Sequence, residues 1–219
     1  SDCNISKLLA LNEETLLAGT INGLFISRDS GKTWQGTQFV ENIRDIYYKD
    51  GVIYIYAVNN GFFISKDSGI KWEKVYDGFI ENFLVINNEV MFGSNENGIY
   101  KSHDNGKNWV HTSKGFTSCT IEDIKFLRNR VYIAYQDLFI SEDNAASWIM
   151  KEKEYFGNTE CLIIPNNNII IASGKSWPVG IIRSTDGGDN WYHVLPNGTD
   201  GAKEFIFDNE GNILAAGMR

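Results

Sequence analysis

An eight-residue pattern returns five times along this chain of 219 residues. The copies read SRDSGKTW (27–34), SKDSGIKW (65–72), SHDNGKNW (102–109), SEDNAASW (141–148) and STDGGDNW (184–191). Their tryptophans stand at positions 34, 72, 109, 148 and 191, so the spacing is nearly constant. A period of about 40 residues is typical of repeat architectures, and it constrains the fold more than any other feature of the sequence.

The residues around each octet also recur. In the second unit four segments follow one another, RDIYYKD, VIYIYAV, GFFISKD and KWEKVYD, and the third unit gives NFLVINN, EVMFGSN, GIYKSHD and NWVHTSK. Each segment is rich in β-branched and aromatic residues and is bounded by Gly, Asn or Asp, which indicates short strands. No segment has helical periodicity. We therefore predict an all-β chain, a β-propeller of four-stranded antiparallel blades.

The spacing predicts a single domain over 1–219, with five complete blades and a half blade. The blades are expected at about 5–38, 39–77, 78–114, 115–156 and 157–198, and the half blade at 201–219. In the half blade KEFIFDNEGNILAAG aligns with SKLLALNEETLLAGT of the first unit, and a sixth octet does not follow. Three alternatives stay open: the chain is part of a longer propeller, the ring closes irregularly, or the last blade pairs with another copy.

The octet predicts the hairpin between the third and fourth strands of a blade. Its aspartate can accept hydrogen bonds from turn N–H groups, its glycine allows positive φ, its serine adds a second side-chain bond, and its tryptophan packs on the sheet. In the fourth copy Ala145 replaces the glycine at a cost of about 1 kcal/mol, so a rearranged turn is expected there. The residues assigned to this scaffold are Ser27, Asp29, Gly31, Trp34, Ser65, Asp67, Gly69, Trp72, Ser102, Asp104, Gly106, Trp109, Ser141, Asp143, Trp148, Ser184, Asp186, Gly188 and Trp191.

The pattern S-x-D-x-G-x-x-W resembles the Asp-box, or BNR repeat, of sialidase-like and sortilin-like β-propellers. The match covers five units and nearly the whole chain. In proteins of this family the Asp-box hairpins lie on the face opposite the ligand site. The resemblance therefore implies a site formed by the loops that enter the first strands and the loops that join the second and third strands.

Two groups of residues are candidates for that site. Charged residues at the entry of the first strands could converge around a cation, sugar hydroxyls or a scissile bond, although strand ends near solvent are commonly charged in any case. They are Arg44, Asp45, Glu81, Glu122, Asp123 and Glu160, with Asn82, Lys203 and Glu204 at related positions. The longer loop ASGKSWPVG (172–180) adds Lys175 and Trp177, whose indole could contact a ligand or pack between blades.

Composition excludes several function classes. The chain has 28 acidic and 20 basic residues, a net charge of -8, which disfavours nucleic acid and anionic membrane surfaces as partners. No apolar run is long enough for a membrane span. The three cysteines form no CxxC pair and are expected to be buried free thiols. No metal site, cofactor site or catalytic residue set is predicted from the known motifs.

Two function classes remain. The first is a non-catalytic module that binds a carbohydrate or a protein or peptide ligand. The alternative is a glycoside hydrolase, sialidase-like or xyloglucanase-like, that uses carboxylates at the channel mouth. A sialidase-like site needs three arginines on one face, where only Arg44 is well placed, and xyloglucanase-like enzymes have two complete propellers. The absence of an assembled catalytic set favours binding, the family resemblance implies secretion, and self-association through the incomplete last blade is a further expectation.

Overall fold

The computed structural model describes residues 4–80, 82–86, 91–95, 97–112, 121–135, 137–151, 159–165, 168–174, 180–194, 201–207 and 212–217. Within these residues the chain forms five four-stranded antiparallel sheets and one two-stranded sheet. In every sheet the strands pair in chain order, so each sheet is a meander and corresponds to one blade. The predicted all-β class and the β-propeller of four-stranded blades with a final half blade are confirmed.

The chain divides into two compact units. Unit one, Ser1–Asn95 and Ile99–His111, contains blades one to three. Their strands are β1 (Ile5–Ala10), β2 (Leu16–Thr20), β3 (Gly23–Ser27) and β4 (Gln35–Gly36); β5 (Ile43–Lys49), β6 (Val52–Ala57), β7 (Gly61–Ser65) and β8 (Glu73–Tyr76); and β9 (Asn82–Val85), β10 (Met91–Asn95), β11 (Gly98–Ser102) and β12 (Val110–His111).

Unit two, Glu96–Gly98 and Thr112–Arg219, contains blades four and five and the half blade. Blade four holds β13 (Asp123–Leu127), β14 (Arg130–Ala134), β15 (Leu138–Ser141) and β16 (Ile149–Met150). Blade five holds β17 (Thr159–Ile163), β18 (Ile170–Gly174), β19 (Ile181–Ser184) and β20 (Tyr192–His193), and the half blade holds β21 (Ala202–Phe207) and β22 (Ile213–Gly217).

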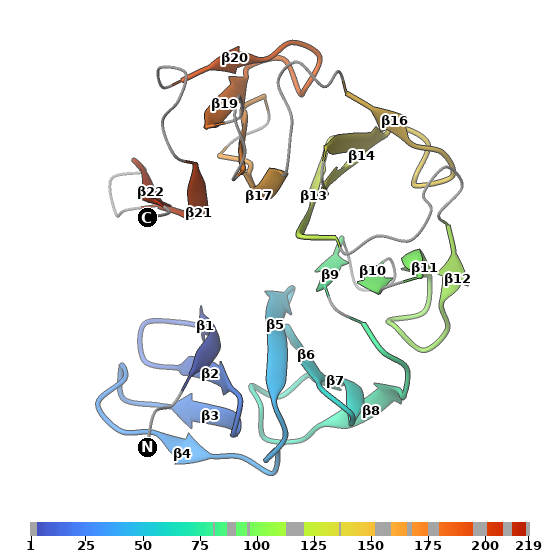
Figure 1. Cartoon of the computed structure of the whole chain (residues 1–219). Coiled ribbons are helices and arrows are strands. Elements are labelled where there is room, and N and C mark those ends of the chain that lie inside the picture. The colour runs from blue at the N-terminus through green and yellow to red at the C-terminus, as the bar shows by residue number, and fades with distance from the viewer. Residues whose placement is uncertain are drawn as a thin grey trace. The chain divides into compact units, whose positions relative to one another are not determined.

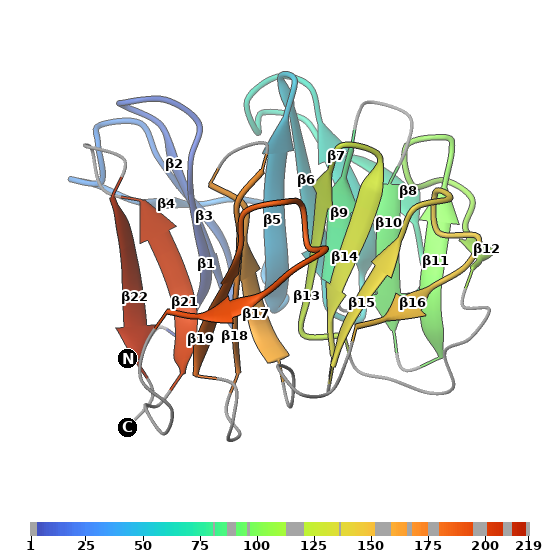
Figure 2. The same cartoon turned by 90° about the horizontal axis from the view of Figure 1, so that it is seen from above.

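Within each unit the blades meet through their first strands. Strand β5 lies against β1 on one side and β9 on the other, and β17 lies against β13 and β21 in the same way. Figure 1 shows the blades of each unit fanning out from these first strands, and Figure 2 shows the strands running between two opposite ends of the blades.

The meander decides which loops share an end of a blade. The turn between the first two strands and the octet hairpin lie together, because Ser30 N donates to Glu14 O at 2.9 Å in blade one and Gly187 N donates to Asn168 O at 3.1 Å in blade five. We call this the hairpin end. The starts of the first strands and the loops between second and third strands therefore lie at the other end, which we call the opposite end.

The apolar core lies between blades and not inside them. One cluster joins Leu17 and Leu24 of blade one to Ile43 and Ile55 of blade two, and another spans blades four and five, including Tyr132 and Ile182. Because neighbouring blades cover both faces of a sheet, strand β6 is buried along its whole length and its sequence is a continuous apolar run. Each blade therefore depends on its neighbour for burial.

The octet hairpins share one hydrogen-bond pattern. In the first, Ser27 Oγ donates to Asp29 Oδ1 at 2.8 Å, Gly31 N donates to Ser27 Oγ at 2.8 Å, and Thr33 N donates to Asp29 Oδ1 at 2.8 Å. Equivalent bonds occur in the other four copies. The octet glycines have positive φ, as predicted, for example 86° at Gly31. The serine and aspartate of each octet therefore bond within their own hairpin.

The expected rearrangement of the fourth turn is wrong for the backbone. Ala145 adopts a φ of 69°, its N–H donates to Ser141 Oγ at 2.8 Å, and Ser147 N donates to Asp143 Oδ1 at 2.8 Å. Because an alanine can occupy the left-handed region for about 1–2 kcal/mol, these bonds are enough to hold it there. The tryptophan differs instead: Trp148 Nε1 donates to Thr112 O at 3.3 Å, whereas Trp34 Nε1 donates to the glycine carbonyl of its own octet.

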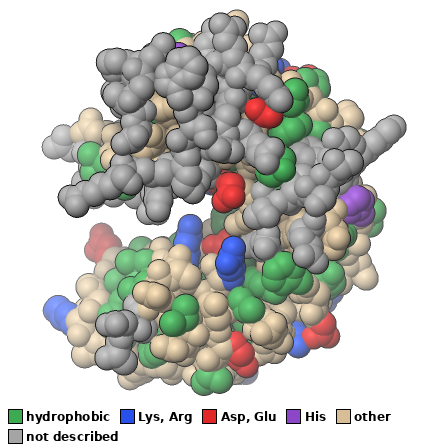
Figure 3. Space-filling model, in the orientation of Figure 1, with side chains coloured by type: hydrophobic (Ala, Val, Ile, Leu, Met, Phe, Trp, Pro, Cys, Tyr) green, Lys and Arg blue, Asp and Glu red, His purple; other side chains and the backbone are tan. Residues whose placement is uncertain are grey.

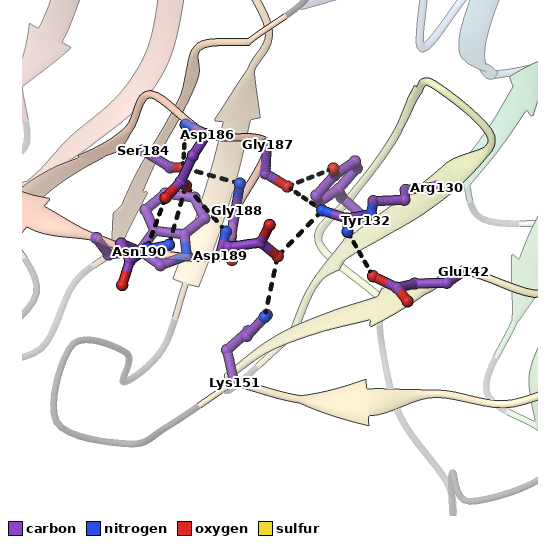
Figure 4. Close-up of polar contacts among 11 residues, drawn as sticks. Arg130, Tyr132, Glu142, Lys151, Ser184, Asp186, Gly187, Gly188, Asp189 and Asn190 are labelled. Carbon is purple, nitrogen blue, oxygen red and sulfur yellow. Dashed lines mark hydrogen bonds and ion pairs between the residues drawn. The ribbon is translucent and has the colours of Figure 1, made fainter.

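The second and fifth hairpins also bond to the preceding blade. Figure 4 shows the fifth hairpin, where Arg130 Nη1 and Tyr132 Oη of blade four donate to Gly187 O at 3.0 and 2.8 Å. Arg130 also pairs with Asp189 at 3.1 Å and with Glu142 at 2.7 Å. In unit one Arg28 Nη2 donates to Ser68 O of the next hairpin at 3.4 Å.

Candidate functional site

Four of the first strands, β1, β5, β17 and β21, carry a β-bulge where they begin, at the opposite end of the blades. In β5 Ile43 pairs with Ala57 and Asp45 pairs with Tyr56, so Arg44 is an extra residue that has no opposite residue in β6. The same shift occurs in β1, β17 and β21, where the extra residues are Ser6, Glu160 and Lys203. Bulges re-aim side chains and are common next to functional sites. All four extra residues are polar or charged.

The bulge in β5 separates the roles of two candidate residues. The side chain of Arg44 is exposed. Asp45 is half-buried, and its Oδ1 accepts a hydrogen bond from Ile46 N at 2.8 Å. Its carboxylate therefore helps to hold the backbone after the bulge, and the guanidinium of Arg44 is the group that the bulge presents to solvent.

Asp123, at the start of β13, links blade four to blade five. Its Oδ1 accepts from Ile124 N at 2.8 Å and from Lys125 Nζ, and its Oδ2 accepts from Leu162 N of β17 at 2.9 Å. Both carboxylate oxygens are thus engaged in structure. The neighbouring Glu122 is exposed, and its backbone N–H donates to Ala134 O at 2.9 Å. Of these two candidate acids, the exposed one is Glu122.

Two other first strands make related links to the next blade. Ser6 Oγ donates to Gly19 O at 2.9 Å and also contacts Ile43 O of blade two. Cys161 Sγ donates to Ala202 O of the half blade at 3.2 Å. Cys161 is a buried free thiol, as the sequence predicted, whereas Cys3 and Cys119 lie outside the described residues. Nothing in the sequence around Ser6 indicates that its side chain forms a contact between blades.

Several predicted site residues cannot be placed by side chain. Glu81, Lys175 and Trp177 lie outside the described residues, and for Glu160, Lys203 and Glu204 the structure describes the strand backbone alone. The structure thus brings Arg44 and Asp45 together at one bulge and Glu122 and Asp123 at the start of β13, each pair within its own unit.

The hairpin aspartates are not free ligands. The Thr33 hydroxyl and N–H, together with Ser27, lower the pKa of Asp29 from 3.8 to about 2, and Ser147 does the same to Asp143. These carboxylates are ionised acceptors inside their turns. Among the residues that the structure describes, no group of three His, Cys, Asp or Glu side chains could hold a metal ion. On the face drawn in Figure 3, charged side chains of both signs are scattered over the part of the surface drawn in colour.

Comparisons with known proteins identify the fold. No protein-family model and no curated protein matches the chain. Among solved structures, a GH74 xyloglucanase from Xanthomonas campestris aligns with a TM-score of 0.75 and 14% identity over 97% of this chain and 43% of that one. The extracellular domain of the putative one component system BT4673 from B. thetaiotaomicron aligns with a TM-score of 0.76 and 14% identity, and the alignment covers 98% of this chain and 32% of that one. YCF48 bound to D1 peptide aligns with a TM-score of 0.50 and 14% identity, and the alignment covers 94% of this chain and 87% of that one.

These identities show a shared fold and nothing further. The chain spans less than half the length of the xyloglucanase and about a third of the BT4673 structure. In the part of the chain that is described, no helix is long and apolar enough to cross a membrane. The propeller neighbours agree with the meander of four-stranded blades seen here, so the chain is a β-propeller.

Proposed function

We propose that this chain is a non-catalytic binding module of the Asp-box (BNR) propeller type, with its ligand site at the opposite end of the blades. The observation that carries the proposal is the repeated β-bulge at the start of four first strands. A bulge weakens the ladder locally, so its recurrence at one structural position is better explained by the side chain that it presents. In β5 that side chain is the exposed guanidinium of Arg44.

In unit one the proposed ligand-binding residues are Arg44 and Glu81, and Asp45 supports the strand start. In unit two they are Glu122, Glu160, Lys175 and Trp177, and Asp123 supports the strand start. Guanidinium and carboxylate groups suit the hydroxyls of a glycan or the polar groups of a peptide. The neighbour YCF48, described as bound to D1 peptide, supports testing peptides alongside glycans. Self-association through the half blade is a further part of the proposal.

The second candidate function is glycoside hydrolysis. The likeness to a GH74 xyloglucanase and the exposed Glu122 favour it. The bonding of Asp123 argues against it, because a catalytic carboxylate needs an oxygen free to take or give a proton, and both Asp123 oxygens already accept bonds from β13 and β17. Within unit two the hydrolase would have to draw its second carboxylate from Glu160. We also propose that the protein is secreted, on the strength of the extracellular BT4673 neighbour.

The proposal is tested by screening the purified chain against peptide and glycan arrays and then measuring affinity for the hits by calorimetry. We expect Arg44→Ala and Trp177→Ala to weaken binding at least fivefold, because each removes a contact of the proposed site. Lys32→Ala is the matched control, since Lys32 is an exposed cation in the first hairpin at the other end of blade one.

Each outcome of the screen is decisive. Binding that survives both site variants, or that Lys32→Ala weakens equally, would place the ligand elsewhere and end the proposal. Release of reducing sugar from a bound glycan, lost in Glu122→Gln, would establish the hydrolase instead.

A further inference from the structure

The half blade leaves a long strand edge open. Strand β22 pairs with β21 on one side, and no strand lies along its other edge among the residues that the structure describes. This edge is five residues long and uncharged, Ile213–Gly217. The outer edges of four complete blades are fourth strands of two residues each, β4, β12, β16 and β20. Because natural sheets protect free edges by charge or by short strands, the unprotected edge of β22 indicates a pairing surface.

The side chains of β22 show what this edge lacks. Ala215 is the third residue of β22, as Ala18 is the third residue of β2. Ala18 lies between its cross-strand partners Leu8 and Phe25 and is 5% exposed. Ala215 pairs with Phe205 on one side, has no partner strand in the described ranges on the other, and is exposed. The difference between the two alanines is the third strand.

The complete blades show which strand fits such an edge. In blade one GLFIS (23–27) runs antiparallel to β2, so that Gly23 pairs with the last residue of β2 and Ser27 pairs with the first. The other third strands are similar, GFFIS, GIYKS, DLFIS and GIIRS, and each ends at the serine of its octet. In the same register an incoming strand would place its glycine opposite Gly217 and its serine opposite Ile213. The strand that fits this edge therefore leads into an octet hairpin.

A second observation concerns the fourth residue of the octet, whose carbonyl accepts bonds from the preceding blade. Arg28 Nη2 donates to Ser68 O at 3.4 Å, and Arg130 Nη1 and Tyr132 Oη donate to Gly187 O at 3.0 and 2.8 Å. Ser68 and Gly187 hold the same place in their octets. At both junctions the preceding blade thus supplies an arginine for the hairpin that docks on it.

Blade five carries an arginine at the junction with the half blade. Arg183 directly precedes the octet serine in β19, the place that Ile140 holds in β15. Ile140 Cδ1 would lie 3.0 Å from a methyl group added at Gly188 of the next hairpin, so this position faces the hairpin of the next blade. Arg183 Nε is buried and has no hydrogen-bond partner within the described part of the chain. A buried N–H without an acceptor is costly, so a hairpin carbonyl docked beside it would be stabilising.

We propose that β22 and Arg183 together form a docking site for a strand and octet hairpin of another polypeptide. The matching segment has a glycine, three mostly apolar residues and then S-x-D-x-G. Its strand pairs with β22, and Arg183 donates to the carbonyl of the fourth residue of its octet. The proposal goes beyond the ligand site at the opposite end of the blades and names a partner for the half blade other than a second copy.

The test uses a synthetic peptide with the sequence of residues 23–36, GLFISRDSGKTWQG, which contains one third strand and its hairpin. It is titrated into the isotopically labelled full chain, and NMR follows the amides of 213–217 and the Nε–H of Arg183. We expect saturable shifts at both places. A second peptide, with residues 28–34 in shuffled order, keeps the strand and loses the hairpin, and should bind about threefold more weakly.

Two variants separate the strand contact from the hairpin contact. Ala215→Glu places a charge beside the apolar strand and should weaken binding of both peptides about fivefold. Arg183→Met should weaken binding of the octet peptide about threefold and leave that of the shuffled peptide unchanged, because the shuffled peptide has already lost this contact. Arg128→Met is the matched control, since Arg128 is an exposed arginine at the hairpin end of blade four. Unchanged shifts of the β17 and β18 amides check the fold of each variant.

The proposal is overturned if no saturable shift appears at 213–217, or if Arg183→Met affects the two peptides equally. Sedimentation of the chain alone tests the other occupant: a dimer that Ala215→Glu dissociates, without peptide shifts, would show that a second copy pairs with β22 instead. The readout lies in the half blade and at Arg183, whereas the ligand screen reads affinities for other probes. Either proposal can therefore fail without the other.

Discussion

At the scale of single residues, the octet aspartates hold the hairpins by accepting bonds from both ends of the turn. In the first hairpin Asp29 Oδ1 takes the Ser27 hydroxyl and Thr33 N, and Asp29 Oδ2 takes the Thr33 hydroxyl at 2.6 Å. Hydrogen bonds to the charged form lower a carboxyl pKa. The pKa of Asp29 falls to about 2, and the pKa values of the other octet aspartates are lowered as well.

A pH dependence of stability follows from these lowered pKa values. A folded-state pKa of about 2 against 3.8 in the unfolded chain means that the stabilisation is complete above about pH 4 and is lost as the pH falls toward 2. We expect the melting temperature to be level from pH 5 to 7 and to fall between pH 4 and 2. Asp29→Asn should lower the melting temperature at pH 7 and make its fall between pH 4 and 2 less steep.

Asp77→Asn is the control for this measurement, since the Asp77 carboxylate is 86% exposed and lies outside the octets. If the melting temperature falls equally steeply between pH 4 and 2 in Asp29→Asn and in Asp77→Asn, the hairpin carboxylates do not determine the stability at acid pH.

Replacing glycine with alanine should lower the free energy of unfolding by different amounts at two positions. Gly188→Ala would place a Cβ 3.0 Å from Ile140 Cδ1 and 3.2 Å from Tyr132 Cε1, at a φ of 92°. Backbone strain and overpacking together should lower the free energy of unfolding by about 2–4 kcal/mol. Gly51→Ala has a similar φ of 82° and nothing within 4 Å, so strain alone should cost about 1–2 kcal/mol. Urea unfolding of the two variants measures the difference, and equal losses would mean that packing at Gly188 is looser than the structure indicates.

At the scale of elements, the strands and hairpins were predictable because they depend on local signals. The predicted GFFISKD contains β7, and KWEKVYD contains β8, although the fourth strands are often shorter than expected, as in β4 and β12. The bulges were not predicted, since a polar residue near the start of a strand does not show that the strand has one residue more than its partner. The bond from Asp123 to Leu162 was also missed, because a contact across 39 residues depends on how blades pack.

The contact between β14 and the fifth hairpin gives a prediction for one element pair. Arg130 is 27% exposed and bonds to Gly187 O, Asp189 and Glu142. Arg130→Met keeps much of the side-chain volume and removes these bonds, and should cost about 1–2 kcal/mol in the free energy of unfolding. Lys151→Met is the matched control, because Lys151 lies 3.9 Å from Asp189 and should contribute less than about 0.5 kcal/mol. A loss at Arg130 no larger than at Lys151 would contradict the role given to this contact.

At the scale of the whole molecule, the repeated sequence builds, within each unit, apolar cores that are shared between consecutive blades. A blade has no core of its own, so loss of one buried side chain should loosen the sheets on both sides of it. This arrangement follows from the sequence only in outline: the period predicts blades, but the sequence does not state which side chains meet across a junction. Phe62 of β7 is an example, because it packs edge-on against Phe83 of blade three with ring centroids 4.9 Å apart.

Phe62→Ala tests this coupling. Phe62 is fully buried and contacts Phe83, Trp109 and Tyr54, so its truncation should cost about 3–5 kcal/mol, a large part of the stability of a domain. Hydrogen exchange should show faster amides in β6 and β7 and also in β9 and β11 of the next blade. Ile70→Ala, at a side chain that is 69% exposed, is the control and should leave exchange unchanged. If exchange speeds up in blade two alone, the blades are independent folding units, and the shared core does not couple them.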